Sequence, residues 1–135
     1  MAYPIEKIEG IGPVFGEKLR AAGIKDTGAL LDHAATPKGR AALAETTGIA
    51  AKLILEFANR ADLMRVKGIG EEYSDLLEAA GVDTVPELAQ RKPENLLAAM
   101  EKSEAAVKRV RRMPTLTEVT AWVAAAKTMP RVLEY

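Results

Sequence analysis

The sequence predicts an all-α fold, and three observations lead to this. Alanine supplies much of the 48% hydrophobic share, and aromatic residues contribute only 4%. No stretch alternates apolar and polar residues as a half-buried strand would. Apolar residues recur at helical spacing, and glycine or proline stands where the helical stretches begin or end. A core of small side chains suits closely packed helices.

The chain also repeats itself at an offset of 58 residues, the separation of Gly10 and Gly68. The matched positions are Ile5 with Leu63, Ile8 with Val66, Gly12 with Gly70, Gly16 with Ser74, Leu19 with Leu77, Gly23 with Gly81, Ile24 with Val82 and Leu30 with Leu88. We interpret this order as an internal duplication. It predicts one domain over 1–135, with repeat units 4–61 and 62–127 sharing one core and a tail over 128–135.

Each unit begins with the same expected elements. A short helix ends at the first glycine, which tolerates the left-handed conformation. Pro13 then suits the first turn of a helix that runs to about Ala22, and its counterpart runs to Ala80. On this helix we expect Val14 and Leu19 to pack against the hairpin partner, across the small residue at position 16.

The remaining elements follow in order. Asp26 is expected to cap a helix near 27–34, and Asp83 or Thr84 one near 85–90. Further helical stretches follow Pro37 and Pro93 and cover 49–64 and 116–126; Thr115 and Glu118 make a capping-box pattern before the last. Phe57 and Trp122 are expected to be equivalent core anchors, and the second unit carries extra residues near Lys102–Met113.

Composition excludes several classes of site. Lys plus Arg and Asp plus Glu both number 19, so the net charge is zero, and there is no cysteine. Disulfides, cysteine-ligated zinc and thiol catalysis are therefore excluded. No apolar run approaches a membrane span, and MAYPIEKIEG lacks a signal-peptide core. We expect a cytoplasmic monomer with no cofactor, no metal site and no catalytic residues; His33, the only histidine, is expected near a helix end facing solvent.

The two copies read IEKIEGIGPVFGEKLRAAGI and LMRVKGIGEEYSDLLEAAGV. This pattern resembles the helix-hairpin-helix family, and the whole chain resembles an uncharacterised bacterial family of paired helix-hairpin-helix domains. The resemblance implies two hairpins about a pseudo-twofold axis, no catalysis, and contact with the DNA backbone without sequence readout. It also implies that carbonyls near Ile8 and Ile11 hold a monovalent cation in related hairpins.

The first glycine turn has the chemistry of a phosphate site. A glycine turn that leads into a helix exposes backbone N–H groups where the helix dipole is positive. In the first copy of the pattern, which we call hairpin one, these N–H groups belong to Gly10, Gly12 and Val14. The set of candidate nucleic-acid-binding residues is Gly10, Ile11, Gly12, Val14, Lys18 and Arg20. The alternative is that the glycines only form a tight turn.

Hairpin two is expected to be structural. Its turn comprises Gly68, Ile69 and Gly70, and the helix that follows carries Glu71, Glu72, Asp75 and Glu78. Carboxylates in a first helical turn satisfy the dipole themselves and repel phosphate. Within the added segment, Ala106, Val107, Val110 and Met113 are expected to face the core, which leaves a basic patch of Lys108, Arg109, Arg111 and Arg112. That patch would bind nucleic acid or an acidic partner, or would pair with the acids of hairpin two.

Two functions therefore remain open. The first is a non-enzymatic module that binds the backbone of double-stranded DNA weakly through hairpin one. The second is a module that binds an unidentified protein, as zero net charge and the acidic second hairpin favour.

Overall fold

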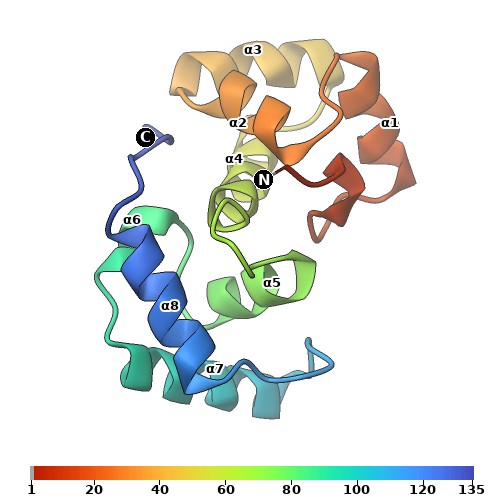
Figure 1. Cartoon of the computed structure of the whole chain (residues 1–135). Helices are drawn as coiled ribbons and strands as arrows, with labels where there is room; N and C mark the ends of the chain where they lie inside the picture. Colours follow the sequence, from red (N-terminus) through yellow and green to blue (C-terminus); the bar gives the residue numbers. More distant parts are fainter. Residues whose placement is uncertain (1) are drawn as a thin grey trace.

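The computed structural model describes residues 2–135, and in this range it contains eight α-helices and no strand (Figure 1). The predicted all-α class is confirmed. No helix in this range is long and apolar enough to cross a bilayer. The elements are the 3-10 turn η1 (Ile5–Lys7) and the helices α1 (Pro13–Ala21), α2 (Thr27–Ala34), α3 (Pro37–Thr47), α4 (Ala51–Leu63), α5 (Glu71–Ala79), α6 (Val85–Ala89), α7 (Pro93–Ala106) and α8 (Leu116–Ala126).

The helices begin where their capping chemistry allows. α1, α3 and α7 each have proline as their first residue, where the missing N–H costs nothing. The Asp26 carboxylate accepts from the Ala29 N–H at 2.8 Å. Thr115 and Glu118 form the complete capping box of α8. These predicted starts are confirmed.

The start of α6 differs from the prediction. Thr84 is the N-cap residue, but its side chain makes no capping hydrogen bond to the helix backbone. The carboxylate of Asp62, which is almost fully buried at the end of α4, accepts from the Val85 N–H at 2.8 Å. A capping group from a distant helix satisfies the same orphan donor.

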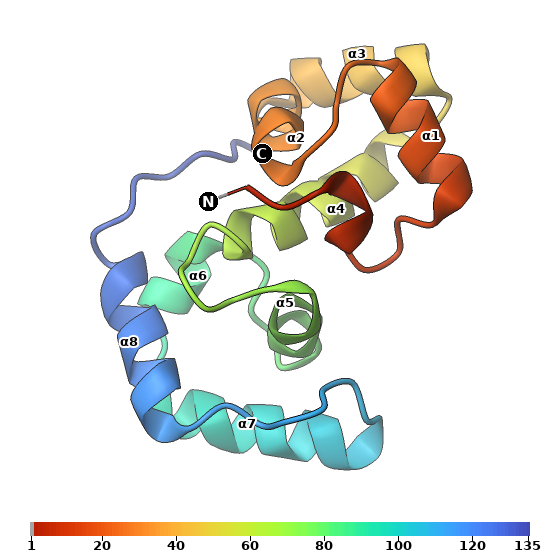
Figure 2. The same ribbon diagram turned by 45° about the vertical axis from the view of Figure 1, so that its right-hand side comes forward.

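Buried apolar side chains form two clusters, where the sequence predicted one shared core. The first cluster draws on η1 through α4, and the second on the end of α4 through α8. Leu63 belongs to the second cluster and the next residue, Met64, to the first. Figure 2 accordingly shows α1 to α3 grouped on one side of α4, and α5 to α8 on the other. Each cluster contains one of the two aromatic anchors, Phe57 in the first and Trp122 in the second.

The C-terminal segment returns to the first half. Leu133 is buried in the first cluster. The Glu134 N–H donates to the Ala35 carbonyl at 2.7 Å, and Arg40 donates to the Glu134 carbonyl at 2.8 Å. Figure 2 shows this segment running from α8 back to α2. It therefore ties the two halves together.

Two expectations about packing were wrong. Val14 is 64% exposed, since it lies on the outer face of the first turn of α1. In the added segment, α7 ends at Ala106 and residues 107–115 form a loop, so two of the four apolar residues expected to face the core do not. Val110 is buried there as predicted and Met113 partly so, whereas Val107 is 55% exposed and Ala106 is also exposed.

Candidate functional site

The two glycine turns have the same backbone geometry. Gly10 and Gly68 have φ angles of +96° and +94°, values that favour glycine. The residue after each glycine donates its N–H to the carbonyl three residues before it, at 3.1 Å in both turns. The bonds are Ile11 N–H to Ile8 O and Ile69 N–H to Val66 O.

The equivalence continues through the helix that follows each turn. Gly16 donates to the Gly12 carbonyl at 2.9 Å, and Ser74 to the Gly70 carbonyl at 3.0 Å. Both helices then close on a left-handed glycine, Gly23 or Gly81. After it, Ile24 N–H bonds Leu19 O and Val82 N–H bonds Leu77 O, at 2.9 Å each.

An aromatic side chain supports each turn from behind. A Cβ added to Gly10 would lie 3.2 Å from Phe57, and one added to Gly68 would lie 3.0 Å from Trp122 Nε1. Phe57 pairs with Phe15, with ring centroids 5.9 Å apart, and Trp122 pairs with Tyr73 at 5.2 Å. Phe57 and Trp122 thus hold matching places, as predicted.

Hairpin one presents its backbone to solvent. Gly10, Gly12 and Val14 are exposed and only Ile11 is buried. α1 has no side-chain cap, and no hydrogen bond among residues 2–135 engages the N–H groups of Gly10, Gly12 and Val14. The predicted amide donors are therefore free at this turn.

The two bases predicted beside hairpin one differ in their partners. Arg20 forms a two-pronged ion pair with Glu6, with both N–O distances 2.7 Å. The Arg20 hydrogen bonds lower the pKa of Glu6 to about 2. Lys18 is exposed and has no ion pair within the described range. Of these two bases, Lys18 therefore remains available to bind an anion.

The Glu6 side chain also explains the small residue at position 16. A Cβ on Gly16 would lie 3.0 Å from the Glu6 carboxylate. Gly16 therefore makes room for Glu6 on η1, the helical turn that precedes it in the hairpin, and so for the Glu6–Arg20 pair.

Two carbonyls of hairpin one already have donors. The Ile8 carbonyl accepts from Ile11, and Arg60 donates from Nη1 to the Glu9 carbonyl at 3.1 Å. The Arg60 guanidinium thus contacts the Glu9 carbonyl of the same turn, beside the Ile8 carbonyl. Within residues 2–135, no cluster of three or more His, Cys, Asp or Glu side chains is arranged to hold a metal. His33 is exposed in the last turn of α2, as predicted.

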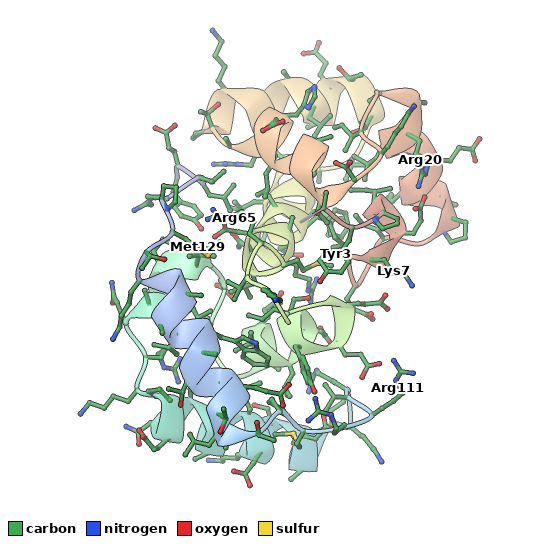
Figure 3. The ribbon with its side chains drawn as sticks, viewed as in Figure 1. Tyr3, Lys7, Arg20, Arg65, Arg111 and Met129 are labelled. Atoms are coloured by element: carbon green, nitrogen blue, oxygen red, sulfur yellow. The ribbon has the colours of Figure 1, made fainter. Side chains whose placement is uncertain are left out.

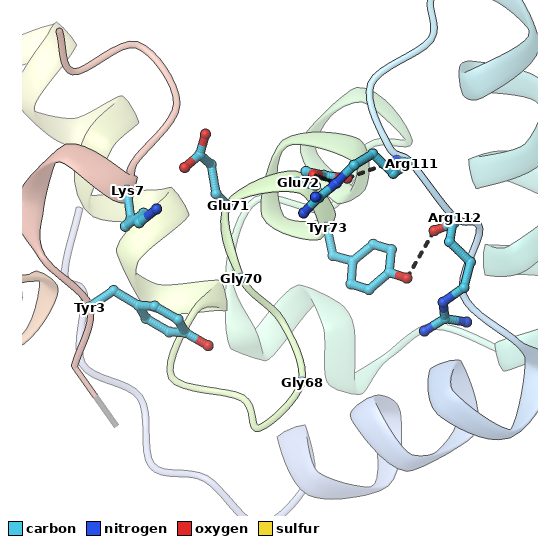
Figure 4. Close-up of a pocket in the computed structure, with 9 residues that line it drawn as sticks. All are labelled: Tyr3, Lys7, Gly68, Gly70, Glu71, Glu72, Tyr73, Arg111 and Arg112. Carbon is cyan, nitrogen blue, oxygen red and sulfur yellow. Dashed lines mark hydrogen bonds and ion pairs between the residues drawn. The ribbon is translucent and has the colours of Figure 1, made fainter.

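Hairpin two lines an open cleft of about 810 Å³, which sequence reasoning did not anticipate. Figure 4 shows three segments meeting there: the N-terminal segment, the turn that leads into α5, and the loop between α7 and α8. The lining residues are Tyr3, Lys7, Gly68, Gly70, Glu71, Glu72, Tyr73, Arg111 and Arg112. Figure 3 shows Lys7 and Arg111 on opposite sides of this opening, and Arg20 away from it.

The basic patch lies beside hairpin two and is largely paired with acids. Arg111 contacts Glu72 at 2.8 Å and Arg112 contacts Glu118 at 2.9 Å. Arg109 lies 3.5 Å from Asp75, and Lys108 is exposed. These bonds support the alternative in which the added segment balances the acids of hairpin two. The hydrogen bond from the Arg111 N–H is the main cause that lowers the pKa of Glu72.

Sequence reasoning missed two side chains that support the turns. Tyr73 falls at the position equivalent to Phe15, so the repeat itself marks it as an aromatic partner of Trp122. Arg60 stands on the apolar helix α4 with its side chain only 14% exposed. It joins the Glu9 carbonyl to Asp75 on α5, a contact that helical spacing does not reveal.

A family model described as a domain of unknown function (DUF4332) matches residues 9–129. The chain belongs to this family. The DUF4332 match includes both glycine turns and the loop with Arg111 and Arg112, and it ends before the segment 130–135 that returns to the first half. Comparisons with curated proteins and with solved structures returned no match.

Proposed function

We propose that this chain is a non-enzymatic binding module made of two helix-hairpin-helix units about a pseudo-twofold axis. Hairpin one contacts the phosphate backbone of double-stranded DNA weakly and without reading sequence. The module acts as a cytoplasmic monomer, and the lack of cysteine suits a reducing compartment. The observation that carries this proposal is the exposed first turn, whose three amides are free at a helix N-terminus.

The hydrogen bonds support the paired-hairpin part of the proposal. Every backbone bond described at hairpin one has a counterpart 58 residues later, from Ile8–Ile5 and Val66–Leu63 onward. Two independent turns would have no reason to share φ angles, helix lengths and closing glycines. A duplicated binding device accounts for all of these.

The electrostatics support weak binding. The amides of Gly12 and Val14 and the positive end of the α1 dipole form a ready anion site. Lys18 adds one free charge, whereas Arg20 is held by Glu6. With few bases and zero net charge, the contact covers few phosphates.

The test is a titration of short duplex DNA at two salt concentrations. Backbone binding must weaken with salt, with a slope set by the number of phosphates neutralised. Lys18→Ala should reduce that slope by about 1 at all sequences tested. Lys127→Ala, an exposed lysine just beyond α8, is the matched control and should leave binding unchanged. Absence of duplex binding at low salt would rule the proposal out.

A second function is favoured by the pairing of the basic patch. Because Arg109, Arg111 and Arg112 all contact acids, Glu71 at the N-terminus of α5 is left without an ion pair in the described residues. This surface suits a protein partner that carries a base. A partner retained by the native protein and by Glu94→Lys, at the start of α7, but lost with Glu71→Lys would support this function.

A further inference from the structure

The cleft beside hairpin two does not include the exposed amides of hairpin one. We propose that it binds a nucleoside phosphate, either as a free nucleotide or as one unit of a single DNA strand. This inference does not depend on duplex binding at hairpin one. The cleft volume of about 810 Å³ lies within the range of ligand sites and exceeds the size of one nucleotide.

The cationic side chains of the cleft provide the phosphate contacts. Lys7, Arg111 and Arg112 line it, against the carboxylates of Glu71 and Glu72. Glu72 is already neutralised, because it accepts from both the backbone N–H and Nε of Arg111 at 2.8 Å. With Arg111 paired to Glu72 and Arg112 to Glu118, Lys7 and Glu71 remain as the charges of the lining that have no ion pair within residues 2–135, so a phosphate depends on individual donors rather than on a net positive charge.

Two of these cations retain free donors. The Arg111 side chain is 93% exposed and bonds Glu72 only through Nε, so both of its terminal NH₂ groups face solvent. Lys7 is exposed and has no ion pair among residues 2–135. Figure 4 shows Lys7 and Arg111 approaching the opening from opposite sides. A phosphate that enters the cleft would gain charge-assisted hydrogen bonds from the Lys7 ammonium on one side or the Arg111 NH₂ groups on the other.

An aromatic ring lies within reach of the same opening. The Tyr3 hydroxyl and ring edge lie 3.9 and 4.0 Å from where a Cβ at Gly70 would stand. The ring is only partly buried, and Figure 4 shows it beside the turn and below Lys7. Nucleobases stack on such a ring regardless of sequence. A cation and an aromatic ring on one wall match the phosphate and base of one nucleotide.

The test is fluorescence anisotropy of a labelled oligodeoxythymidylate of about ten nucleotides, a length typical of single-strand sites. Lys7→Ala and Arg111→Ala should each weaken binding about three- to tenfold at low salt. Their matched controls are Lys127→Ala just beyond α8 and Lys108→Ala, which is in the same loop as Arg111 but outside the cleft lining. Both controls should stay within about twofold of the native protein.

The ring is tested by replacing Tyr3, whose backbone bonds to Thr27 remain in every variant. Tyr3→Leu should weaken binding at least about fivefold, and Tyr3→Phe should restore it. Circular dichroism of each variant checks that the helices are retained. Equal binding by Tyr3→Leu and Tyr3→Phe would overturn the stacking assignment.

Two further ligands separate the outcomes. If free thymidine monophosphate displaces the labelled oligonucleotide, the ligand is a free nucleotide. If the oligonucleotide binds and thymidine monophosphate does not displace it, the ligand is a single DNA strand. Duplex binding that Lys18→Ala weakens, with no binding of the oligonucleotide or the nucleotide, overturns the cleft proposal and leaves the proposed function standing. Oligonucleotide binding that Lys7→Ala and Arg111→Ala leave unchanged also overturns it.

Discussion

Gly68 shows how a single residue is constrained in two ways. Its φ of +94° disfavours any side chain, and a Cβ would lie 3.0 Å from Trp122 Nε1. Gly23 has a similar φ of +88°, but nothing lies within 4 Å of the corresponding position. The two glycines therefore separate backbone strain from steric contact.

Replacing each with alanine measures the two contributions. Gly23→Ala should cost about 1 kcal/mol of unfolding free energy, from backbone strain alone. Gly68→Ala should cost about 2–4 kcal/mol, because the buried indole must also move. Urea denaturation of both variants gives the comparison. Equal costs would show that Trp122 does not constrain the turn.

Side chains at this scale were partly predictable. The repeat marked Gly10, Gly68, Phe57 and Trp122 for matching places, because a duplicated turn needs the same support twice. It also placed Val14 inside, and the 64% exposure of Val14 shows why this failed. A helix of nine residues has few turns, and spacing alone does not fix which face its first turn buries.

At the scale of one element, α8 depends on an ionised cap. Glu118 bonds Arg112 and the N–H of Thr115, and these contacts lower its pKa from 4.5 to about 2, with the Arg112 hydrogen bond as the largest cause. Because the folded pKa lies below the unfolded one, the carboxylate stabilises the fold above pH 4.5. That contribution is lost as the pH falls from 4.5 through about 2.

Glu118→Gln should therefore flatten the decline of stability in acid. The urea concentration at the unfolding midpoint of the native protein should fall between pH 4.5 and 2. The midpoint of the variant should fall less, because its amide does not titrate. Glu6 has the same low pKa, so some decline persists. Urea midpoints measured across this pH range check the prediction. Superimposable curves for the two proteins would contradict it.

Helix boundaries were the most predictable feature of the elements. Proline at first positions and the Asp26 and Thr115 caps act through neighbouring backbone, so sequence alone reveals them. The capping of α6 by Asp62 was missed, because its donor and acceptor are 23 residues apart. Four apolar residues of the added segment were expected to face the core. The helix ends at Ala106, so the loop 107–115 does not keep these residues on one face.

The whole molecule is two clusters joined by α4 and by the returning C-terminal segment. Helical spacing identified which side chains are buried, but not which of two cores receives each one. The closing residues 130–135 are too short for any periodicity, so their contact with the first half could not be foreseen. The cleft was missed for the same reason, because three distant segments form it.

Leu133→Ala should destabilise the first cluster. Leu133 is 2% exposed, and removal of a buried leucine side chain costs about 2–5 kcal/mol. Hydrogen exchange should show protection falling in α2 and α4, which pack in that cluster, before it falls in α8. Tyr135→Ala, at a side chain 58% exposed, is the control and should change stability little. Equal loss of protection in both halves would contradict the division into two cores.

Arg60 gives this arrangement a consequence for cooperativity. Its guanidinium donates to the Glu9 carbonyl in hairpin one at 3.1 Å and to Asp75, on the helix that hairpin two begins, at 3.3 Å. Asp75 in turn faces Arg109 of the loop at 3.5 Å. A ligand that shifts one turn must therefore change the energy of the other, and linkage makes that influence reciprocal. The two halves, which bury their cores separately, would respond to an occupant as one unit.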